Sequence, residues 1–142
     1  MTHHLPQPLV QAFLTCREII ENMRTGEFVL IGPFTYVPAT DFPVNLRASI
    51  YIQFKGGHGT YALDFHLRDL EANVLWQSPP VEVDHSDPLF PYRIAIHDML
   101  IAIPKAGKYD LVLSANGEEL SYQTLWIGPA ELFAGESETL VD

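Results

Sequence analysis

The chain has 142 residues, of which 47% are hydrophobic, with 11 prolines and 9 glycines. This is enough for one domain with a real core, and so many turn formers predict short strands joined by tight turns. Eight Lys and Arg stand against 18 Asp and Glu, a net charge of −10, which argues against nucleic acids and anionic membranes as partners because both attract clustered basic residues.

The expected location is cytoplasmic. Cys16 is the lone cysteine, so no disulfide can form within the chain, which suits a reducing compartment. The opening stretch MTHHLPQPLVQAFLTC has no Lys or Arg before its apolar residues, unlike a secretory signal. No apolar run approaches the ~20 residues that span a bilayer, so no membrane span is expected.

Residues 9–26, LVQAFLTCREIIENMRTG, fit two structures. Leu9, Phe13 and Ile20 fall near helical spacing, with Gly26 as a helix C-cap. The β-branched and aromatic content fits a strand at about 10–17 and a turn near 24–26 equally well. The pattern alone leaves both structures open.

The next segment, EFVLIGPFTYV, predicts an extended chain with one apolar face. That face carries Phe28, Leu30, Phe34 and Tyr36. Gly32-Pro33 inside the segment predicts a bulge or an edge position, because proline cannot donate a hydrogen bond to a neighbouring strand. The stretch PATDFP follows as a loop.

The middle of the chain predicts a long hairpin. Apolar and polar residues alternate through 46–55 and again through 60–68, on either side of GGHG at 56–59. Folding about this turn places an apolar residue opposite each apolar residue, and a one-residue slip would destroy the match. The expected pairs are Phe54 with Tyr61, Ile52 with Leu63, Ile50 with Phe65 and Ala48 with Leu67.

Three further strands are expected before the last hairpin. Two short ones, at 74–77 and 81–84, are separated by Ser78-Pro79-Pro80. The stretch YRIAIHDMLIAIP then begins as an alternating strand with Tyr92, Ile94 and Ile96 inward. Asp98 would be the next inward residue, so this strand is expected to end or cross over near His97-Asp98.

The closing stretch PKAGKYDLVLSANGEEL predicts a second hairpin. Asn116-Gly117 is a strong turn signal, because a type I′ turn needs positive φ at both central residues. The expected pairs are Leu113 with Leu120, Leu111 with Tyr122, Tyr109 with Thr124, Ser114 with Glu119 and Asp110 with Gln123.

Together these elements predict an all-β fold, an antiparallel β-sandwich of about seven or eight strands. The expected organisation is an N-terminal extension at 1–8, the sandwich domain at 9–128, and an acidic, mobile tail at 129–142.

Three stretches carry a family resemblance. They are FLTCREIIENMRTGEFVLIGPFTYV, RASIYIQFKGGHGTYALDFHLRDLEANVLW and IPKAGKYDLVLSANGEELSYQTLWI. In order and spacing they resemble DUF6941, a bacterial family of uncharacterised proteins, over roughly residues 10–128. The resemblance implies a small immunoglobulin-like β-sandwich and favours strand and turn over helix in the ambiguous opening segment. It implies no activity, and PKAG departs from the Pro-Gly turn usual in the family.

The candidate metal ligands lie in the stretch DHSD at 84–87 and at His97. Carboxylates and imidazoles at Asp84, His85 and Asp87, with His97 as a further ligand, could coordinate a divalent cation. The same residues suit a solvated turn before Pro88. The favoured interpretation is the turn, with no metal and no cofactor.

Other reactive residues are interpreted as structural. Cys16 lies in an apolar stretch and is expected to be a buried thiol. His66 is expected to be a polar residue on an exposed sheet face. The three glycines of GGHG lie between strands, whereas a phosphate-binding loop leads from a strand to a helix.

A contact surface is expected where aromatic or apolar residues lie outside the core. The alternation of residues 46–55 places Tyr51 on the solvent-exposed face of its strand, and Trp76 lies between short strands. Leu125 and Ile127 fall opposite the face of Tyr122. In the tail, Leu132 and Phe133 form a short docking motif. The alternative is that loops or an edge strand cover these side chains.

The predicted function is therefore non-enzymatic binding, as a scaffold, accessory subunit or interaction module with a protein partner or a second copy of itself. One alternative is a small-ligand or carbohydrate-binding sandwich that stacks ligands on Tyr51 and Trp76. Another is a metal-dependent hydrolase built on Asp84, His85, Asp87 and His97.

Overall fold

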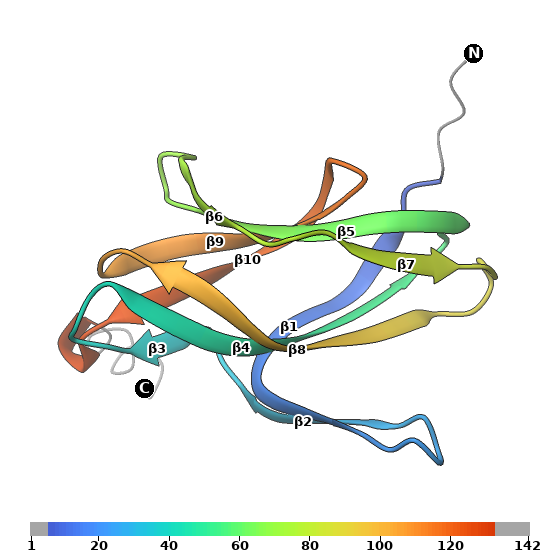
Figure 1. Ribbon diagram of the computed structural model, residues 1–142, viewed down its shortest axis with the longest axis horizontal. Helices are drawn as coiled ribbons and strands as arrows, with labels where there is room; N and C mark the ends of the chain where they lie inside the picture. Colours follow the sequence, from blue (N-terminus) through green and yellow to red (C-terminus); the bar gives the residue numbers. More distant parts are fainter. Residues whose placement is uncertain (1–5, 133–142) are drawn as a thin grey trace, which may run out of the picture.

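The computed structural model describes residues 6–132 and arranges them as ten strands and one short 3-10 helix in two packed sheets (Figure 1). This confirms the all-β sandwich, with more strands than the seven or eight expected. The elements are β1 Leu9–Glu21, β2 Phe28–Pro33, β3 Tyr36–Pro38, β4 Val44–Lys55, β5 Gly59–Arg68, β6 Val74–Gln77, β7 Val81–His85, β8 Tyr92–Ile103, β9 Gly107–Ala115, β10 Glu118–Gly128 and η1 Ala130–Leu132.

One sheet has the strand order β2-β1-β4-β8, and the other has the order β3-β10-β9-β5-β6 with β7 also paired to β5. The pairs are antiparallel except for β3 with β10, which run parallel. β6 and β7 follow one another along the same edge of β5, because Ser78–Pro80 interrupts what would otherwise be one strand.

The inward faces of the two sheets share one core. Its largest fully buried side chains include Tyr109, Phe54 and Phe65. Burial of these apolar surfaces is the main force that holds the sheets together. The remaining buried members are Ala48, Ile50, Ile52, Tyr61, Leu63, Leu67, Val83, Ile101, Ile103, Leu111, Leu113, Ala115, Leu125 and Ile127.

The predicted middle hairpin is wrong in its pairing. β4 is hydrogen-bonded to β1 and β8, whereas β5 is hydrogen-bonded to β9, β6 and β7. The turn after β4, with Gly56 at a φ of 80°, carries the chain from one sheet to the other. Residues such as Ile52 and Leu63 are buried as expected, but in opposite sheets. The alternation of apolar and polar residues determines which face of a strand is buried, but it does not determine which strand is its hydrogen-bonding partner.

The ambiguous opening segment is a strand. β1 pairs with β4 as far as the Cys16–Ser49 pair, and beyond Cys16 it pairs with β2. Figure 1 shows β1 bending away from the sandwich to form a hairpin with β2. β2 lies at the edge of its sheet and ends at Pro33, in agreement with the edge position predicted from Gly32-Pro33.

β8 does not end near His97-Asp98, so that prediction is wrong. The strand continues to Ile103 through a bulge, where Asp98 has a φ of 53° and its N–H donates to Ser49 Oγ (3.2 Å). The extra residue shifts the inward positions from Ile96 to Met99. A charged residue at an inward position was thus accommodated by a bulge rather than by a strand end.

The closing hairpin also contains a bulge. Glu119 pairs with Ser114 as predicted, but the register shifts by one residue at Leu120. The other four predicted pairs are therefore wrong, and Tyr109 lies opposite Leu125 instead of Thr124. This shift turns Leu125 inward and leaves Tyr122 exposed.

Candidate functional site

The four candidate metal ligands do not form one site. His85 is 3% exposed and packs against the rings of Phe54 and Tyr92, with ring centroids 5.4 and 5.6 Å away. Asp84 and Asp87 are exposed. Within residues 6–132, no three His, Cys, Asp or Glu side chains are grouped so that they could hold a metal ion. A hydrolase built on these residues has no assembled centre.

His97, the fourth candidate, lies in β8 just before the bulge. Its Nε2 atom is 3.9 Å from Glu21 Oε1, at the end of β1. Both side chains are largely exposed, so this contact contributes little to stability. Its acidic neighbour is therefore Glu21 and not the DHSD segment.

Two predicted contact residues are in the core. Leu125 and Ile127 are fully buried, so their assignment to an exposed surface is wrong. The reason is the bulge at Leu120, which reverses the faces of the following residues of β10. In the tail, Leu132 ends η1, and Phe133 lies outside the described residues.

The two aromatic residues of the predicted platform have little exposed surface. Tyr51 lies on the outer face of its sheet, as alternation predicted, but it is only 9% exposed. Phe28 of β2 packs edge-on against it, with ring centroids 5.4 Å apart, and the Tyr51 hydroxyl donates to Gln53 Oε1. Trp76 is half-buried against the main core. Tyr51 therefore offers almost no surface for stacking a sugar ring.

Cys16 is fully buried, as expected. It packs with Ile19 and Tyr51 in a second, small apolar cluster. Burial raises the pKa of the Cys16 thiol, because the thiolate would lose its solvation. A thiol in this setting is a packing residue and a poor nucleophile.

The second cluster is covered by a hairpin that we call the β1–β2 arm, residues 17–33. Its inner face carries Ile19, Phe28 and Leu30, which pack toward Tyr51. The guanidinium of Arg93 lies over the ring of Phe28, 5.5 Å from its centroid. The arm is thus held against the sandwich by apolar and cation–π contacts.

The opposite side of the arm, its outer face, is also apolar. Ile20 pairs with Val29, and Glu18 pairs with Ile31, so these four side chains point to the same side. Ile20, Val29 and Ile31 are 47%, 51% and 40% exposed. No described element covers them. Sequence reasoning missed this surface because it followed only one face of each strand.

A sequence signal for it exists in FVLI at 28–31, an unbroken apolar run of the kind found in strands with two apolar faces.

A small pocket lies at the base of the arm. It encloses about 130 Å³ and is lined by residues of β1, the β2–β3 link, β3 and β4. We call it the arginine pocket, and its lining residues are Arg17, Phe34, Tyr36, Val37, Pro38, Leu46 and Arg47. No sequence motif marks it, because its two arginines are thirty positions apart.

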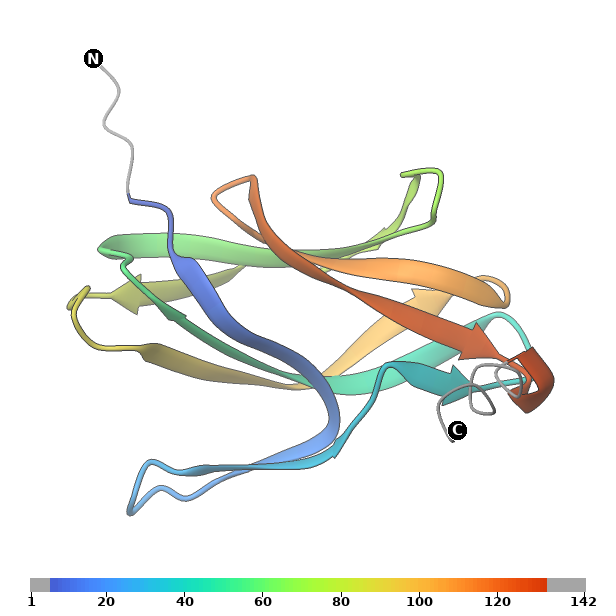
Figure 2. The same ribbon diagram turned by 180° about the vertical axis from the view of Figure 1, so that it is seen from behind.

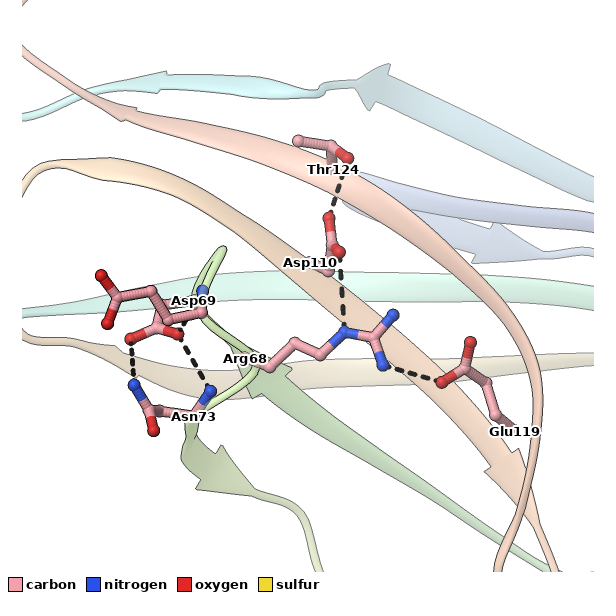
Figure 3. A network of polar contacts seen from close by, with 7 residues as sticks. Arg68, Asp69, Asn73, Asp110, Glu119 and Thr124 are labelled. Atoms are coloured by element: carbon pink, nitrogen blue, oxygen red, sulfur yellow. Dashed lines mark hydrogen bonds and ion pairs between the residues drawn. The ribbon is translucent and has the colours of Figure 1, made fainter.

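A network of charges lies on the other sheet (Figure 3). Arg68 Nη1 donates to Glu119 Oε1 at 2.8 Å, and Arg68 Nε lies 3.6 Å from Asp110 Oδ2. Asp110 also accepts from the Thr124 hydroxyl. The hydrogen bond to Glu119 raises the pKa of Arg68 above its ordinary value. These contacts tie β5 to the β9–β10 hairpin, and each charge has a partner within the network.

The described residues contain no helix long and apolar enough to cross a membrane. They form a two-sheet β-sandwich with an apolar arm and a small pocket lined by two arginines. The chain belongs to the Family of unknown function (DUF6941), whose model matches residues 11–127. This confirms the resemblance carried by the three sequence stretches. Comparison with curated proteins finds no match for this chain.

Proposed function

We propose that this protein is a non-enzymatic binding module that holds a protein partner on the outer face of the β1–β2 arm. One observation carries the proposal. Ile20, Val29 and Ile31 are exposed together on a hairpin whose inner face is already packed against the sandwich. An apolar surface of this kind gains free energy when a partner removes it from water.

Charge indicates what kind of partner fits. Glu18 lies on the outer face itself, and the arm as a whole carries the glutamates Glu18, Glu21 and Glu27 against the arginines Arg17 and Arg24. The whole chain carries a net charge of −10, so two copies repel each other at long range. The partner that fits is a different protein with an apolar centre and a basic rim, rather than a second copy of the chain.

We also propose that the sandwich is immunoglobulin-like. Two features support this proposal. β3 runs parallel to the last strand, β10, beside an otherwise antiparallel sheet. The hydroxyl of Tyr109, near the start of β9, donates to the carbonyl of Lys105 four residues upstream, which is the bond of a tyrosine corner. A bacterial, cytoplasmic setting is part of the same proposal, and it suits a lone buried cysteine.

The test is site-specific photocrosslinking in native host cells. A photoreactive residue at Ile31 is compared with one at Leu100, an apolar position on β8 that is somewhat more exposed. We expect a discrete crosslinked protein from position 31 and none from position 100. The purified partner should then bind the wild-type chain, lose affinity for an Ile20→Ser/Val29→Ser variant, and bind more weakly as salt is raised.

Three outcomes would contradict the proposal. The first is the same products from both positions. The second is no product from position 31. The third is a product that contains two copies of this chain, which would make the arm a homodimer contact.

A further inference from the structure

The arginine pocket exists because β1 changes partners. β1 leaves β4 after the Cys16–Ser49 pair, so β4 from Val44 to Ala48 has no described strand on that side. The link between β2 and β3 turns past the bend of β1, as Figure 2 shows. It is fastened there by two hydrogen bonds, from Phe34 N to Thr15 O and from Thr15 Oγ1 to Phe34 O. The pocket occupies the resulting gap between the sheets.

The lining combines two cations with apolar walls. Arg17 comes from β1 and Arg47 from β4, while Phe34, Val37 and Leu46 supply half-buried apolar surface. Such a pocket suits a ligand that is anionic at one end and apolar at the other.

Arg17 and Arg47 differ from three other basic residues of the described chain, whose side chains have an ion-pair or aromatic partner. Arg68 is paired with carboxylates, Arg93 lies over Phe28, and Lys108 lies 3.8 Å from the centroid of the Trp126 ring. Arg17 and Arg47 have no hydrogen bond or ion pair with any residue of 6–132. Within the described part of the chain, two arginines without a carboxylate partner line one pocket, which favours an anionic ligand there.

The side chain of Arg17 is guided into place by Gly32. A Cβ at residue 32 would lie 3.0 Å from Arg17 Cδ and 3.1 Å from Cγ. The aliphatic part of Arg17 therefore runs across bare backbone that any larger residue would obstruct. Glycine at residue 32 therefore leaves room for the Arg17 side chain in the position where it lines the pocket.

We propose that the arginine pocket binds a small carboxylate carried on an apolar body. Guanidinium groups match carboxylates with paired hydrogen bonds, and the apolar walls accept the rest of the ligand. A volume of about 130 Å³ has room for a short aliphatic or single-ring group, well below the ~300 Å³ of the smallest drug-sized sites. A free organic acid and the C-terminal residue of a peptide share this chemistry.

The experiment is an NMR titration of the ¹⁵N-labelled chain that follows backbone amides and arginine Nε–H groups. The probes are sodium benzoate, inorganic phosphate, and a short peptide ending in phenylalanine, with either a free or an amidated C-terminus. The variants are Arg17→Gln and Arg47→Gln. Arg24→Gln is the matched control, because Arg24 is an exposed arginine outside the pocket.

We expect saturable benzoate shifts at Arg17 and Arg47, and a loss of affinity of about tenfold or more in each pocket variant but not in Arg24→Gln. Binding of the free-acid peptide but not its amide would assign the ligand to peptide C-termini. Binding of benzoate alone would assign it to free organic acids.

The proposal is overturned by an absence of saturable shifts, by an equal loss in Arg24→Gln, or by phosphate binding as tightly as benzoate. These results are independent of the arm's outer face, because Ile20→Ser/Val29→Ser alters no residue that lines the pocket. A negative result for carboxylate binding at the pocket can therefore be distinguished from a negative result for partner binding on the outer face of the arm.

Discussion

Gly57 lies so close to the imidazole of His85 that a Cβ at residue 57 would come within 2.8 Å of His85 Nδ1. The same Cβ would be 3.2 Å from the Tyr61 hydroxyl and 3.3 Å from Pro8 Cγ. His85 Nε2 is 3.0 Å from the carbonyl oxygen of Phe90, which can only accept, so Nε2 carries the proton. Position 57 therefore requires glycine for lack of space.

The first prediction concerns this contact. Gly57→Ala should destabilise the protein by about 1–3 kcal/mol, because the imidazole is buried and cannot move aside without disturbing Phe54 and Tyr92. Urea unfolding measures the loss. In a His85→Ala background the same substitution should cost less, since the main obstacle is gone. An equal cost in both backgrounds would show that the contact with His85 is not the cause.

The second prediction concerns the tyrosine corner. Tyr109→Phe removes the hydroxyl that donates to Lys105 O, so this part-buried hydrogen bond is lost. The expected loss in the free energy of unfolding is about 0.5–1.5 kcal/mol. Tyr122→Phe is the control, because it makes the same chemical change on an exposed ring. Equal midpoints for the two variants in urea would argue that the corner bond adds nothing.

The third prediction separates backbone strain from contact. Gly26 and Gly32 have φ values of 75° and 63°, so alanine at either position is strained by about 1–2 kcal/mol. A Cβ meets nothing within 4 Å at Gly26, whereas at Gly32 it meets Arg17. Gly32→Ala should therefore destabilise more than Gly26→Ala, and it alone should weaken benzoate binding at the arginine pocket. Identical binding curves for the two variants would contradict the role given to Gly32.

The fourth prediction tests the bulge in β10. Leu125→Ala should cost about 2–5 kcal/mol, because Leu125 is fully buried opposite Tyr109 and its loss leaves a cavity. Leu100→Ala, on the exposed side of β8, should change stability by less than ~0.5 kcal/mol. The midpoints of urea unfolding, measured for the two variants and the wild type, give the comparison. A small effect at Leu125 would support the unbulged register, in which this residue faces outward.

The fifth prediction concerns pH. Asp69 holds the β5–β6 turn by accepting from the N–H groups of Glu71 and Asn73 and from the Asn73 side-chain amide. The bond from the Asn73 backbone N–H is the main cause that lowers the pKa of Asp69 below its ordinary 3.8. A lowered carboxyl pKa means that this stabilisation is fully present above pH 3.8 and is lost as pH falls through the folded-state pKa.

Asp69→Asn should accordingly be less stable than the wild type near neutral pH, and the difference should shrink in acid. Urea midpoints measured along a pH series give the comparison. A difference that stays constant through the acid range would mean that ionisation of Asp69 does not contribute to the turn.

The alternation of apolar and polar residues along each strand was sufficient to predict which face of the strand is buried. Ile50, Ile52, Leu63 and Phe65 are buried as their alternation predicts, and Asn116-Gly117 forms the turn with positive φ at both residues. These features depend on near neighbours in the chain: the two-residue period of a strand and the backbone freedom of glycine and asparagine. The all-β class could therefore be read from the residues directly.

Tertiary structure decided partners, registers and the sites. β4 and β5 have matching apolar patterns but are hydrogen-bonded to other strands and not to each other. The apolar face of a strand is buried equally well by packing against the opposite sheet, so a matching pattern does not require two strands to pair. One-residue bulges at Asp98 and Leu120 each reversed the faces that follow them, and the bulge at Leu120 placed Leu125 and Ile127 in the core.

The same limit applies to the candidate sites. Alternation predicts the correct face for Tyr51, but Phe28 of the β1–β2 arm covers it. Arg17 and Arg47 line one pocket only because β1 parts from β4 where it does. Which side chains of a strand face water and which face the core could be predicted from the residues, since that is a local property of the chain. Which strands meet, and what lies between them, was decided by packing among residues far apart in sequence, which local periodicity does not encode.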